Sequence, residues 1–237
     1  MLNITINDRK LQAPEGWTIL QAAREHGISI PALCDSEGVE PYGACRLCMV
    51  EIKHGNRSRL VASCLYPAEE GLVVETDSER ALAARKVTAE LMLARSPHAK
   101  KVQDIAAALG IKHTDLVIKG TDCILCALCV RTCREVVGAS AISLSNRGVE
   151  REVAPPLGET AHDCIGCGSC VYVCPTNFIK MDDVDGVRKI HNWKVEFKMK
   201  KCKVCGNYIA PEKQLEHFSK KLGIPLDFFD TCTTCRK

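Results

Sequence analysis

Aromatic residues are scarce in this chain of 237 residues, and no apolar run is long enough to span a membrane. Aromatic side chains make up only 5% of the sequence, so several small domains are more expected than one large core. The net charge is only +3, which by itself indicates no nucleic-acid partner. These features argue against a membrane-spanning protein and favour a multidomain one.

Signatures of nucleotide binding and of catalysis are also missing. The sequence contains no GxGxxG fingerprint, no phosphate-binding P-loop and no recognisable nucleophile constellation. We therefore expect that the chain has no catalytic residue of its own and does not bind NAD or flavin by itself.

Cysteine, in contrast, is abundant, and all sixteen cysteines fall into sets of four. The sets are Cys34, Cys45, Cys48 and Cys64; Cys123, Cys126, Cys129 and Cys133; Cys164, Cys167, Cys170 and Cys174; and Cys202, Cys205, Cys232 and Cys235. Thiolates grouped in this way are ligands of iron-sulfur clusters and of tetrahedral zinc. Disulfides would need an oxidising compartment, but the first residues have neither a basic nor an apolar signal region, so we expect a reducing cytoplasm.

The first 78 residues have the pattern of a small α+β domain. Leu2, Ile4 and Ile6 alternate with polar residues and predict the first strand of a hairpin, and Thr18 with Gln21 forms a capping box that predicts a short helix. A cysteine-bearing loop and returning strands at 49–53, 60–62 and 72–76 follow. This order predicts the β-grasp fold of 2Fe-2S ferredoxins over residues 1–78.

A tandem repeat with an offset of 41 residues follows a cysteine-free helical segment at 79–118. Both copies read DCxxCxxCxxxC, the pattern of a ferredoxin domain with two 4Fe-4S clusters, which we place at 119–181. In such domains the fourth cysteine of each run binds the other cluster. We therefore assign Cys123, Cys126, Cys129 and Cys174 to one cluster, and Cys164, Cys167, Cys170 and Cys133 to the other. Two zinc sites would not explain why a third and a fourth cysteine follow at the same spacing in both copies.

The segment 41–51, which reads PYGACRLCMVE, and the segment 61–64, which reads VASC, carry a resemblance to a known family. They resemble the N-terminal part of the large iron-sulfur subunit of respiratory complex I and the diaphorase iron-sulfur subunit of NAD-reducing hydrogenases. Related modules begin some iron-only hydrogenases and NAD-dependent formate dehydrogenases. The resemblance covers roughly residues 1–181 and implies that Cys34, Cys45, Cys48 and Cys64 bind a 2Fe-2S cluster, although their spacing is not that of plant-type ferredoxins.

One feature of the family is absent. The family usually holds a further 4Fe-4S cluster in the helical segment with one histidine and three cysteines. His98 lies about where that histidine would be, but no cysteine accompanies it. Because a single imidazole cannot hold a cubane, we expect His98 to be an ordinary surface or helix-capping residue and the segment 79–118 to be structural.

The region 182–237 is expected to contain an amphipathic strand and a four-cysteine metal element. Trp193, Val195, Phe197 and Met199 alternate with charged residues and predict the strand. The two CxxC pairs, at Cys202 and Cys205 and at Cys232 and Cys235, favour zinc, while a rubredoxin-like iron and a third 4Fe-4S cluster remain alternatives. A helix ending at Gly223 is expected between the pairs, with His217 not needed as a ligand.

The resemblance implies an electron-transfer subunit of a soluble multi-subunit oxidoreductase. Its partners would be a flavoprotein subunit that binds FMN or FAD and NAD(P)H, and a second redox enzyme such as a hydrogenase or formate dehydrogenase; electron bifurcation is one form that such a complex takes. A free-standing polyferredoxin-like carrier is the alternative. A redox-sensing module that binds nucleic acid through its zinc knuckles is disfavoured by the weak basic signal.

Overall fold

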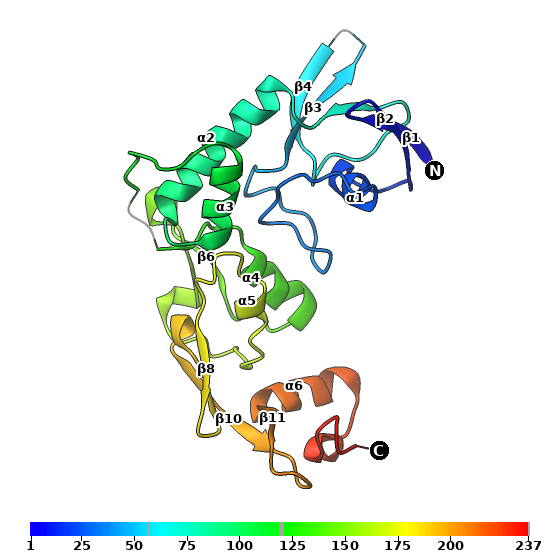
Figure 1. The fold of residues 1–237 in the computed structure, drawn as a ribbon. Coiled ribbons are helices and arrows are strands. Elements are labelled where there is room, and N and C mark those ends of the chain that lie inside the picture. Colours follow the sequence, from blue (N-terminus) through cyan, green and yellow to red (C-terminus); the bar gives the residue numbers. More distant parts are fainter. Residues whose placement is uncertain (56, 119–120, 237) are drawn as a thin grey trace. The chain divides into compact units, whose positions relative to one another are not determined.

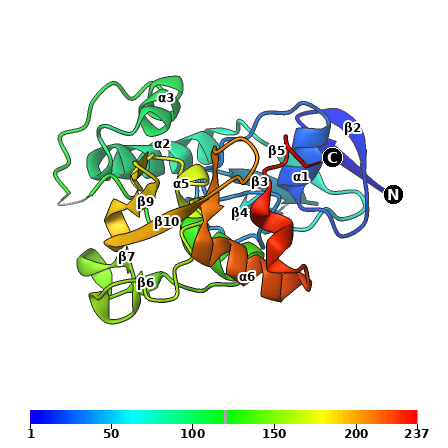
Figure 2. The same cartoon turned by 90° about the horizontal axis from the view of Figure 1, so that it is seen from below.

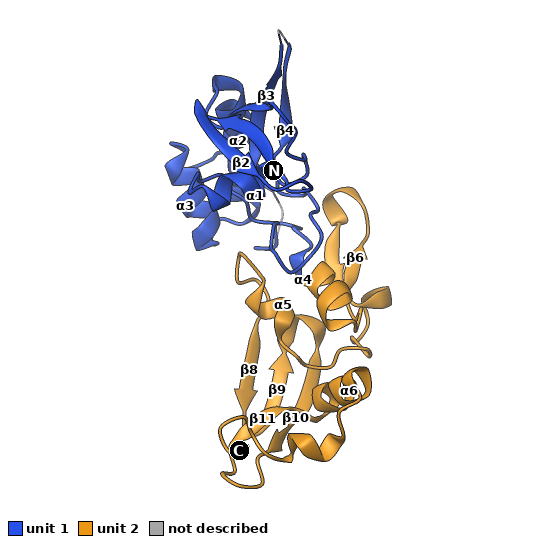
Figure 3. Ribbon diagram, turned by 90° about the vertical axis from the view of Figure 1, so that its right-hand side faces the viewer, with its two compact units in different colours: residues 1–128 blue, residues 129–237 orange. Residues whose placement is uncertain are grey.

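The computed structural model describes residues 1–55, 57–118 and 121–236. It divides into two compact units, Met1–Leu128 and Cys129–Lys237, which are coloured separately in Figure 3 and are described one at a time. Residues 119–120, where the sequence predicts that the dicluster domain begins, lie outside the described part. Within the described part, every helix is too short or too polar to cross a membrane.

The first unit is built on a mixed five-stranded sheet (Figure 1). The strand order is β2-β1-β5-β3-β4; β1 and β5 are parallel, and the other neighbours are antiparallel. The elements are β1 (Leu2–Ile6), β2 (Arg9–Ala13), α1 (Ile19–Glu25), β3 (Met49–His54), β4 (Arg57–Ala62) and β5 (Val73–Glu75). The hairpin, the short helix, the cysteine-bearing loop and the three returning strands therefore follow one another in the expected order.

The alternation in the sequence produces the core of this sheet. Ile4 and Ile6 of β1 are buried, as are the residues of α1 that face them. The predicted capping box is present, because the backbone N–H of Thr18 donates to the Gln21 side chain at 2.8 Å and the backbone N–H of Gln21 donates to the Thr18 hydroxyl at 3.2 Å. The helix thus starts where its sequence signal lies.

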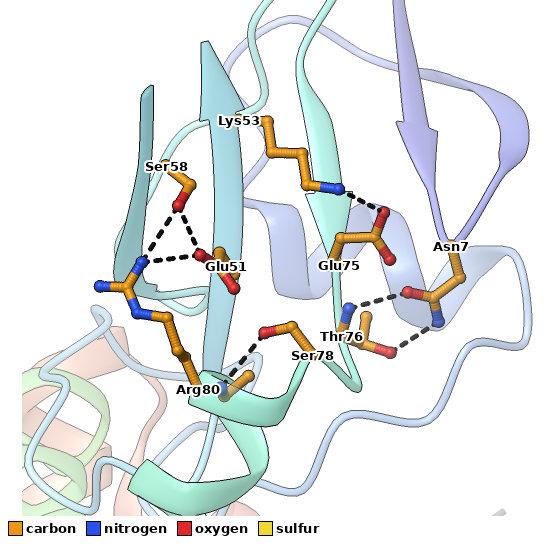
Figure 4. Close-up of polar contacts among 9 residues, drawn as sticks. Asn7, Glu51, Lys53, Ser58, Glu75, Thr76, Ser78 and Arg80 are labelled. Atoms are coloured by element: carbon orange, nitrogen blue, oxygen red, sulfur yellow. Dashed lines mark hydrogen bonds and ion pairs between the residues drawn. The ribbon is translucent and has the colours of Figure 1, made fainter. Parts of the chain in front are cut away.

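Helices α2 (Glu79–Arg95) and α3 (Lys100–Ala108) form the expected helical segment. Ser78 caps α2 by accepting a hydrogen bond from the backbone N–H of Ala81 (Figure 4). Figure 4 also shows how the helix start is joined to the sheet: the Glu51 carboxylate on β3 accepts from the Ser58 hydroxyl at 2.6 Å and from the Arg80 guanidinium at 2.7 Å. The pKa of Glu51 lies below its usual value. The hydrogen bond from Ser58 is the largest cause, and the charge of Arg80 lowers the pKa further.

The second unit contains two small sheets, with strand orders β11-β10-β9-β8 and β6-β7. Its elements are α4 (Leu128–Arg131, which starts at the end of the first unit), η1 (Thr132–Val137), β6 (Ser143–Ser145), η2 (Gly148–Glu150), β7 (Glu152–Ala154), η3 (Pro156–Gly158), α5 (Ser169–Tyr172), β8 (Met181–Val184), β9 (Val187–Ile190), η4 (His191–Trp193), β10 (Val195–Lys201), β11 (Tyr208–Pro211), α6 (Glu212–Leu222) and η5 (Leu226–Asp230). Helix α6 packs against β11 and against β10, beside which it lies in Figure 2, and it ends at Gly223, as expected.

One predicted element starts later than its sequence pattern indicates. The alternation of apolar residues begins at Trp193, but β10 begins at Val195. Lys194 has a φ of 53°, in the left-handed region, and this conformation separates the strand from the preceding 3-10 turn that contains Trp193. Trp193 is therefore a turn residue, and it is only 2% exposed.

Candidate iron-sulfur and metal sites

The first four cysteines meet in the loops at one end of the five-stranded sheet. Cys34 and Cys45 lie in the long loop between α1 and β3, Cys48 directly precedes β3, and Cys64 follows β4. All four are at most 2% exposed. The backbone N–H of Cys45 donates to the Cys34 sulfur at 3.3 Å, and the sulfurs of Cys48 and Cys64 lie 3.3 Å apart.

The electrostatics of this group favour the thiolate form at Cys45 and Cys48. The hydrogen bond from Cys34 lowers the pKa of Cys45 to about 6, and the hydrogen bond from Cys64 lowers that of Cys48 to about 7. The pKa values of Cys34 and Cys64 rise because each shares its proton with its partner and is buried. Thiolates are the form of cysteine that binds iron, so the donor set fits a 2Fe-2S cluster.

Arg85 of α2 is buried beside this group, with only 2% of its surface exposed. Its Nε donates to the carbonyl of Met49, the residue after Cys48, at 2.9 Å. Its ion pair with Asp77 is long, at 3.5 Å, and the Asp77 side chain is 69% exposed. The Nη2 group is buried without a hydrogen-bond partner.

Burial lowers the pKa of Arg85, whereas the charges of Asp77 and of the Cys48 thiolate raise it. A buried guanidinium with one long, exposed ion pair and a free N–H group needs further negative charge nearby. A cluster held by four thiolates would provide that charge. The region therefore fits an anionic 2Fe-2S cluster in its charge as well as in its ligands.

In the second unit, Cys133 of η1 and the first three cysteines of the second run line the same cavity. These residues are Cys133, Cys164, Cys167 and Cys170, and the apolar side chains of Ile142, Ile165 and Ile190 complete the wall together with Trp193. Burial raises the pKa of Cys170 to about 12 and also raises those of Cys133 and Cys164. A set of thiolates in such a cavity is stable only with a bound cation, which the irons of a 4Fe-4S cluster would supply.

Two glycines allow the chain to wrap closely around this cavity. Gly166 has a φ of +73°, and a Cβ atom there would lie 2.6 Å from the Phe197 ring. Gly168 has a φ of +74°, and its Cβ would lie 2.8 Å from the Met181 sulfur. Both the backbone conformation and the available space therefore require glycine between the cysteines of the second run.

The remaining cysteines of the tandem repeat are divided between the units. Cys123 and Cys126 belong to the first unit, while Cys129 and Cys174 belong to the second. The Cys174 sulfur lies 3.5 Å from the Thr176 hydroxyl. The assignment of these four residues to one cluster stays a prediction.

The last four cysteines form a tight cluster of ligand atoms. The sulfurs of Cys202, Cys205, Cys232 and Cys235 all lie within 4.8 Å of one another. Among the described residues, no other group of three or more cysteine, histidine or acidic ligand atoms is as compact. Four sulfurs bound tetrahedrally at about 2.3 Å to one ion would be about 3.8 Å apart, which matches the 3.8 Å between Cys205 and Cys232.

Backbone N–H groups of the two knuckles stabilise negative charge on this cluster. Those of Cys205 and Cys232 lower the pKa of Cys202 to about 6, while the hydrogen bonds that the Cys235 thiol donates to the side chains of Cys205 and Cys232 raise its own pKa to about 12. The donor set fits a single tetrahedral ion. Two expectations about histidine agree with the structure: His217 Nε2 lies 3.1 Å from the Val137 carbonyl rather than among the sulfurs, and His98 is exposed between α2 and α3.

Sequence reasoning missed Arg85 and the position of Trp193. A signal for Arg85 exists, because Ala81, Arg85, Ala89 and Leu93 are spaced by four residues and form the buried stripe of α2. An arginine in an otherwise apolar stripe indicates a buried charge with a specific partner. No comparable signal marks Trp193, whose alternation with its neighbours is that of an ordinary strand residue.

Comparison with known proteins identifies iron-sulfur domains of the two expected types. Family models match at residues 1–79 (2Fe-2S iron-sulfur cluster binding domain), 116–181 (4Fe-4S dicluster domain) and 163–210 (a second model of a 4Fe-4S dicluster domain). The crystal structure of an NAD+-reducing NiFe hydrogenase in the H2-reduced state is similar, with a TM-score of 0.66 and 26% identity, covering 75% of this chain and 86% of that chain.

Curated relatives belong to several redox proteins. The chain is 35% identical to NADP-reducing hydrogenase subunit HndD of Solidesulfovibrio fructosivorans, over 74% of this chain and 35% of that protein. It is 33% identical to an NADH-quinone oxidoreductase subunit of Rhizobium meliloti and 32% identical to the alpha subunit of the NADPH-Fe(3+) oxidoreductase of Geobacter sulfurreducens. Each of these two alignments covers 74% of this chain. They cover 23% of the Rhizobium meliloti protein and 24% of the Geobacter sulfurreducens protein. The chain thus spans about a third or less of these relatives.

These matches confirm the resemblance inferred from the cysteine motifs. The chain is an iron-sulfur protein in which a 2Fe-2S domain precedes a 4Fe-4S dicluster domain, and it is homologous to subunits of NADP-reducing hydrogenase and of NADH-quinone oxidoreductase.

Proposed function

We propose that this chain is an electron-transfer subunit of a multi-subunit oxidoreductase in a reducing cytoplasm. It relays electrons between a flavoprotein subunit that binds FMN or FAD and NAD(P)H, and a second redox enzyme such as a hydrogenase or formate dehydrogenase. The observation that carries the proposal is the succession of four-cysteine sets, the first of them fully buried, in a chain that has no nucleotide-binding motif. Such a chain is suited to carrying single electrons between enzymes rather than to catalysis.

Three clusters are assigned to the cysteine sets. Cys34, Cys45, Cys48 and Cys64 hold a 2Fe-2S cluster. Cys123, Cys126, Cys129 and Cys174 hold one 4Fe-4S cluster, and Cys164, Cys167, Cys170 and Cys133 hold the other. The common cavity of the last four residues supports their assignment. When bound, each cluster accepts and releases one electron, while the buried side chains around it exclude water and set its potential.

The C-terminal ligands Cys202, Cys205, Cys232 and Cys235 are assigned to zinc with a structural role. The sulfur spacing favours a single ion over a cubane, whose four irons and four sulfides would hold the thiolates further apart. Helix α6 lies between the two CxxC pairs and is hydrogen-bonded to the segments that carry cluster ligands. Lys213 donates to the carbonyl of His162 at 2.5 Å, and Lys221 donates to the carbonyl of Val136 at 3.2 Å.

The proposal is tested with anaerobically purified protein. NADH donates a hydride, and a flavin must divide its two electrons before one-electron clusters can accept them. The isolated chain should therefore show no NADH:viologen activity, and adding the flavoprotein partner should restore reduction of the clusters. Bleaching of the cluster absorbance by NADH alone, without flavin, would contradict the proposal. Purification from the native cell as a monomer would instead indicate a free-standing polyferredoxin-like carrier.

A further inference from the structure

Trp193 directs its only polar group at a cysteine that is assigned to a cluster. The indole Nε1 lies 3.4 Å from the Cys170 sulfur, and Trp193 is 2% exposed. Cys170 and Trp193 line the same cavity as Cys133, Cys164 and Cys167. An indole nitrogen can donate a hydrogen bond but cannot accept one, so the sulfur is the acceptor in this contact.

The position of Trp193 is set by a turn that is bonded to the chain just after the second cysteine run. The Asn192 side chain accepts from the backbone N–H of Lys180 at 2.8 Å and donates to the carbonyl of Phe178 at 3.4 Å. The backbone N–H of His191 donates to the Lys180 carbonyl at 3.1 Å. The left-handed conformation of Lys194 then turns the chain into β10. These contacts hold the indole against Cys170 from a segment that contains no ligand of its own.

We propose that Trp193 is a positioning residue that raises the reduction potential of the 4Fe-4S cluster held by Cys133, Cys164, Cys167 and Cys170. The inference rests on the proposed assignment of these cysteines to a cluster. When the cluster accepts an electron, negative charge increases on its sulfurs and ligands. A donor aimed at a ligand sulfur therefore stabilises the reduced form more than the oxidised form.

The contact also makes the two 4Fe-4S clusters of the tandem repeat different from each other. Trp193 reaches Cys170, which belongs to one cluster only, and the sequence contains one other tryptophan, Trp17. Trp17 packs against the core of the first unit. We therefore infer that the cluster near Trp193 accepts electrons at a higher potential than it would without this hydrogen bond, while the other clusters are unaffected.

The test is an EPR-monitored redox titration of the full-length chain, with Trp193→Phe as the variant and Trp17→Phe as the matched control. Trp193→Phe keeps an aromatic ring in the cavity but removes the N–H donor. We expect it to lower the midpoint potential of one 4Fe-4S cluster and to leave the other two clusters unchanged, while Trp17→Phe shifts none. An unchanged potential in Trp193→Phe with full iron content, or an equal shift of all the clusters, would overturn the inference.

A second measurement keeps the test independent of how the variant folds. Wild-type protein labelled with 15N at the indole nitrogen should show a nitrogen coupling to one reduced 4Fe-4S cluster in pulsed EPR. Absence of this coupling from wild-type protein would refute the contact. Failure of the proposed cluster assignment is distinguishable, because wild-type protein would then lack the iron and the EPR signals of two 4Fe-4S clusters.

Discussion

Arg85 offers a direct test of how the protein controls the 2Fe-2S cluster. It is a buried cation whose Nε binds the carbonyl of Met49, next to the ligand Cys48, and its Nη2 has no hydrogen-bond partner. We compare Arg85→Met, which keeps much of the side-chain volume but removes the charge, with Arg85→Lys, which keeps the charge. Because the reduced cluster is more negative than the oxidised one, loss of the cation should lower the reduction potential.

The size of the effect follows from the distance over which the charge acts. Arg85 binds the carbonyl of Met49, the residue after Cys48, so we take a separation on the order of 8 Å, about two peptide units, between its charge and the Cys48 sulfur. At this distance and an effective dielectric constant of about 20, a unit charge contributes about 2 kcal/mol, which corresponds to about 90 mV for a one-electron couple. Arg85→Met also leaves the Met49 carbonyl without its donor, at a cost of about 1 to 3 kcal/mol of stability.

The assay is an EPR-monitored redox titration of the 2Fe-2S signal, with iron content measured in parallel. Arg85→Met should shift the potential downward by a value on the order of 90 mV, and Arg85→Lys should retain most of the wild-type value. Both variants should keep their iron. If Arg85→Met retains the cluster and its potential is unchanged, or if Arg85→Lys shifts as far as Arg85→Met, the charge of Arg85 does not control the cluster.

Three further predictions concern the ligands and the sheet. Cys232→Ser should remove one zinc and no iron, leaving about 10 iron atoms per chain; metal analysis that shows a loss of about four iron atoms would identify a cubane instead. Cys133→Ala should damage the 4Fe-4S cluster of the second cysteine run, and EPR loss confined to the other cluster would contradict the crossed assignment. The pKa of Glu51 is lowered by the Ser58 hydroxyl and by Arg80, so its stabilising effect is complete above the ordinary value of 4.5 and is lost as the pH falls below that value and through the lower pKa of the folded protein. Glu51→Gln should therefore lower the anaerobic melting temperature by the same amount at every pH from about 8 to 5, and a difference that shrinks within this range would refute the assignment.

The local elements and most of the chemistry follow from sequence patterns. The Thr18 capping box, the start of α2 after Ser78 and the end of α6 at Gly223 all lie where short-range rules place them, because each signal acts within one or two helical turns. The cysteine spacings are equally local. Ligands with only two residues between them must lie in one loop, so the spacing indicates the type of metal centre before any tertiary contact is known.

What surrounds the ligands was decided by the tertiary structure. Arg85 reaches Met49 across 36 residues of sequence, and Trp193 reaches Cys170 across 23. Neither contact is encoded in a local period; indeed, the alternation predicts Trp193 to be a strand residue, but the structure places it in the turn before β10. The sequence alone determined which residues can bind metal, because thiolate chemistry depends on residue type and spacing. The folded chain alone determined which charges and N–H groups face those sulfurs, because burial brings together groups that are distant in sequence.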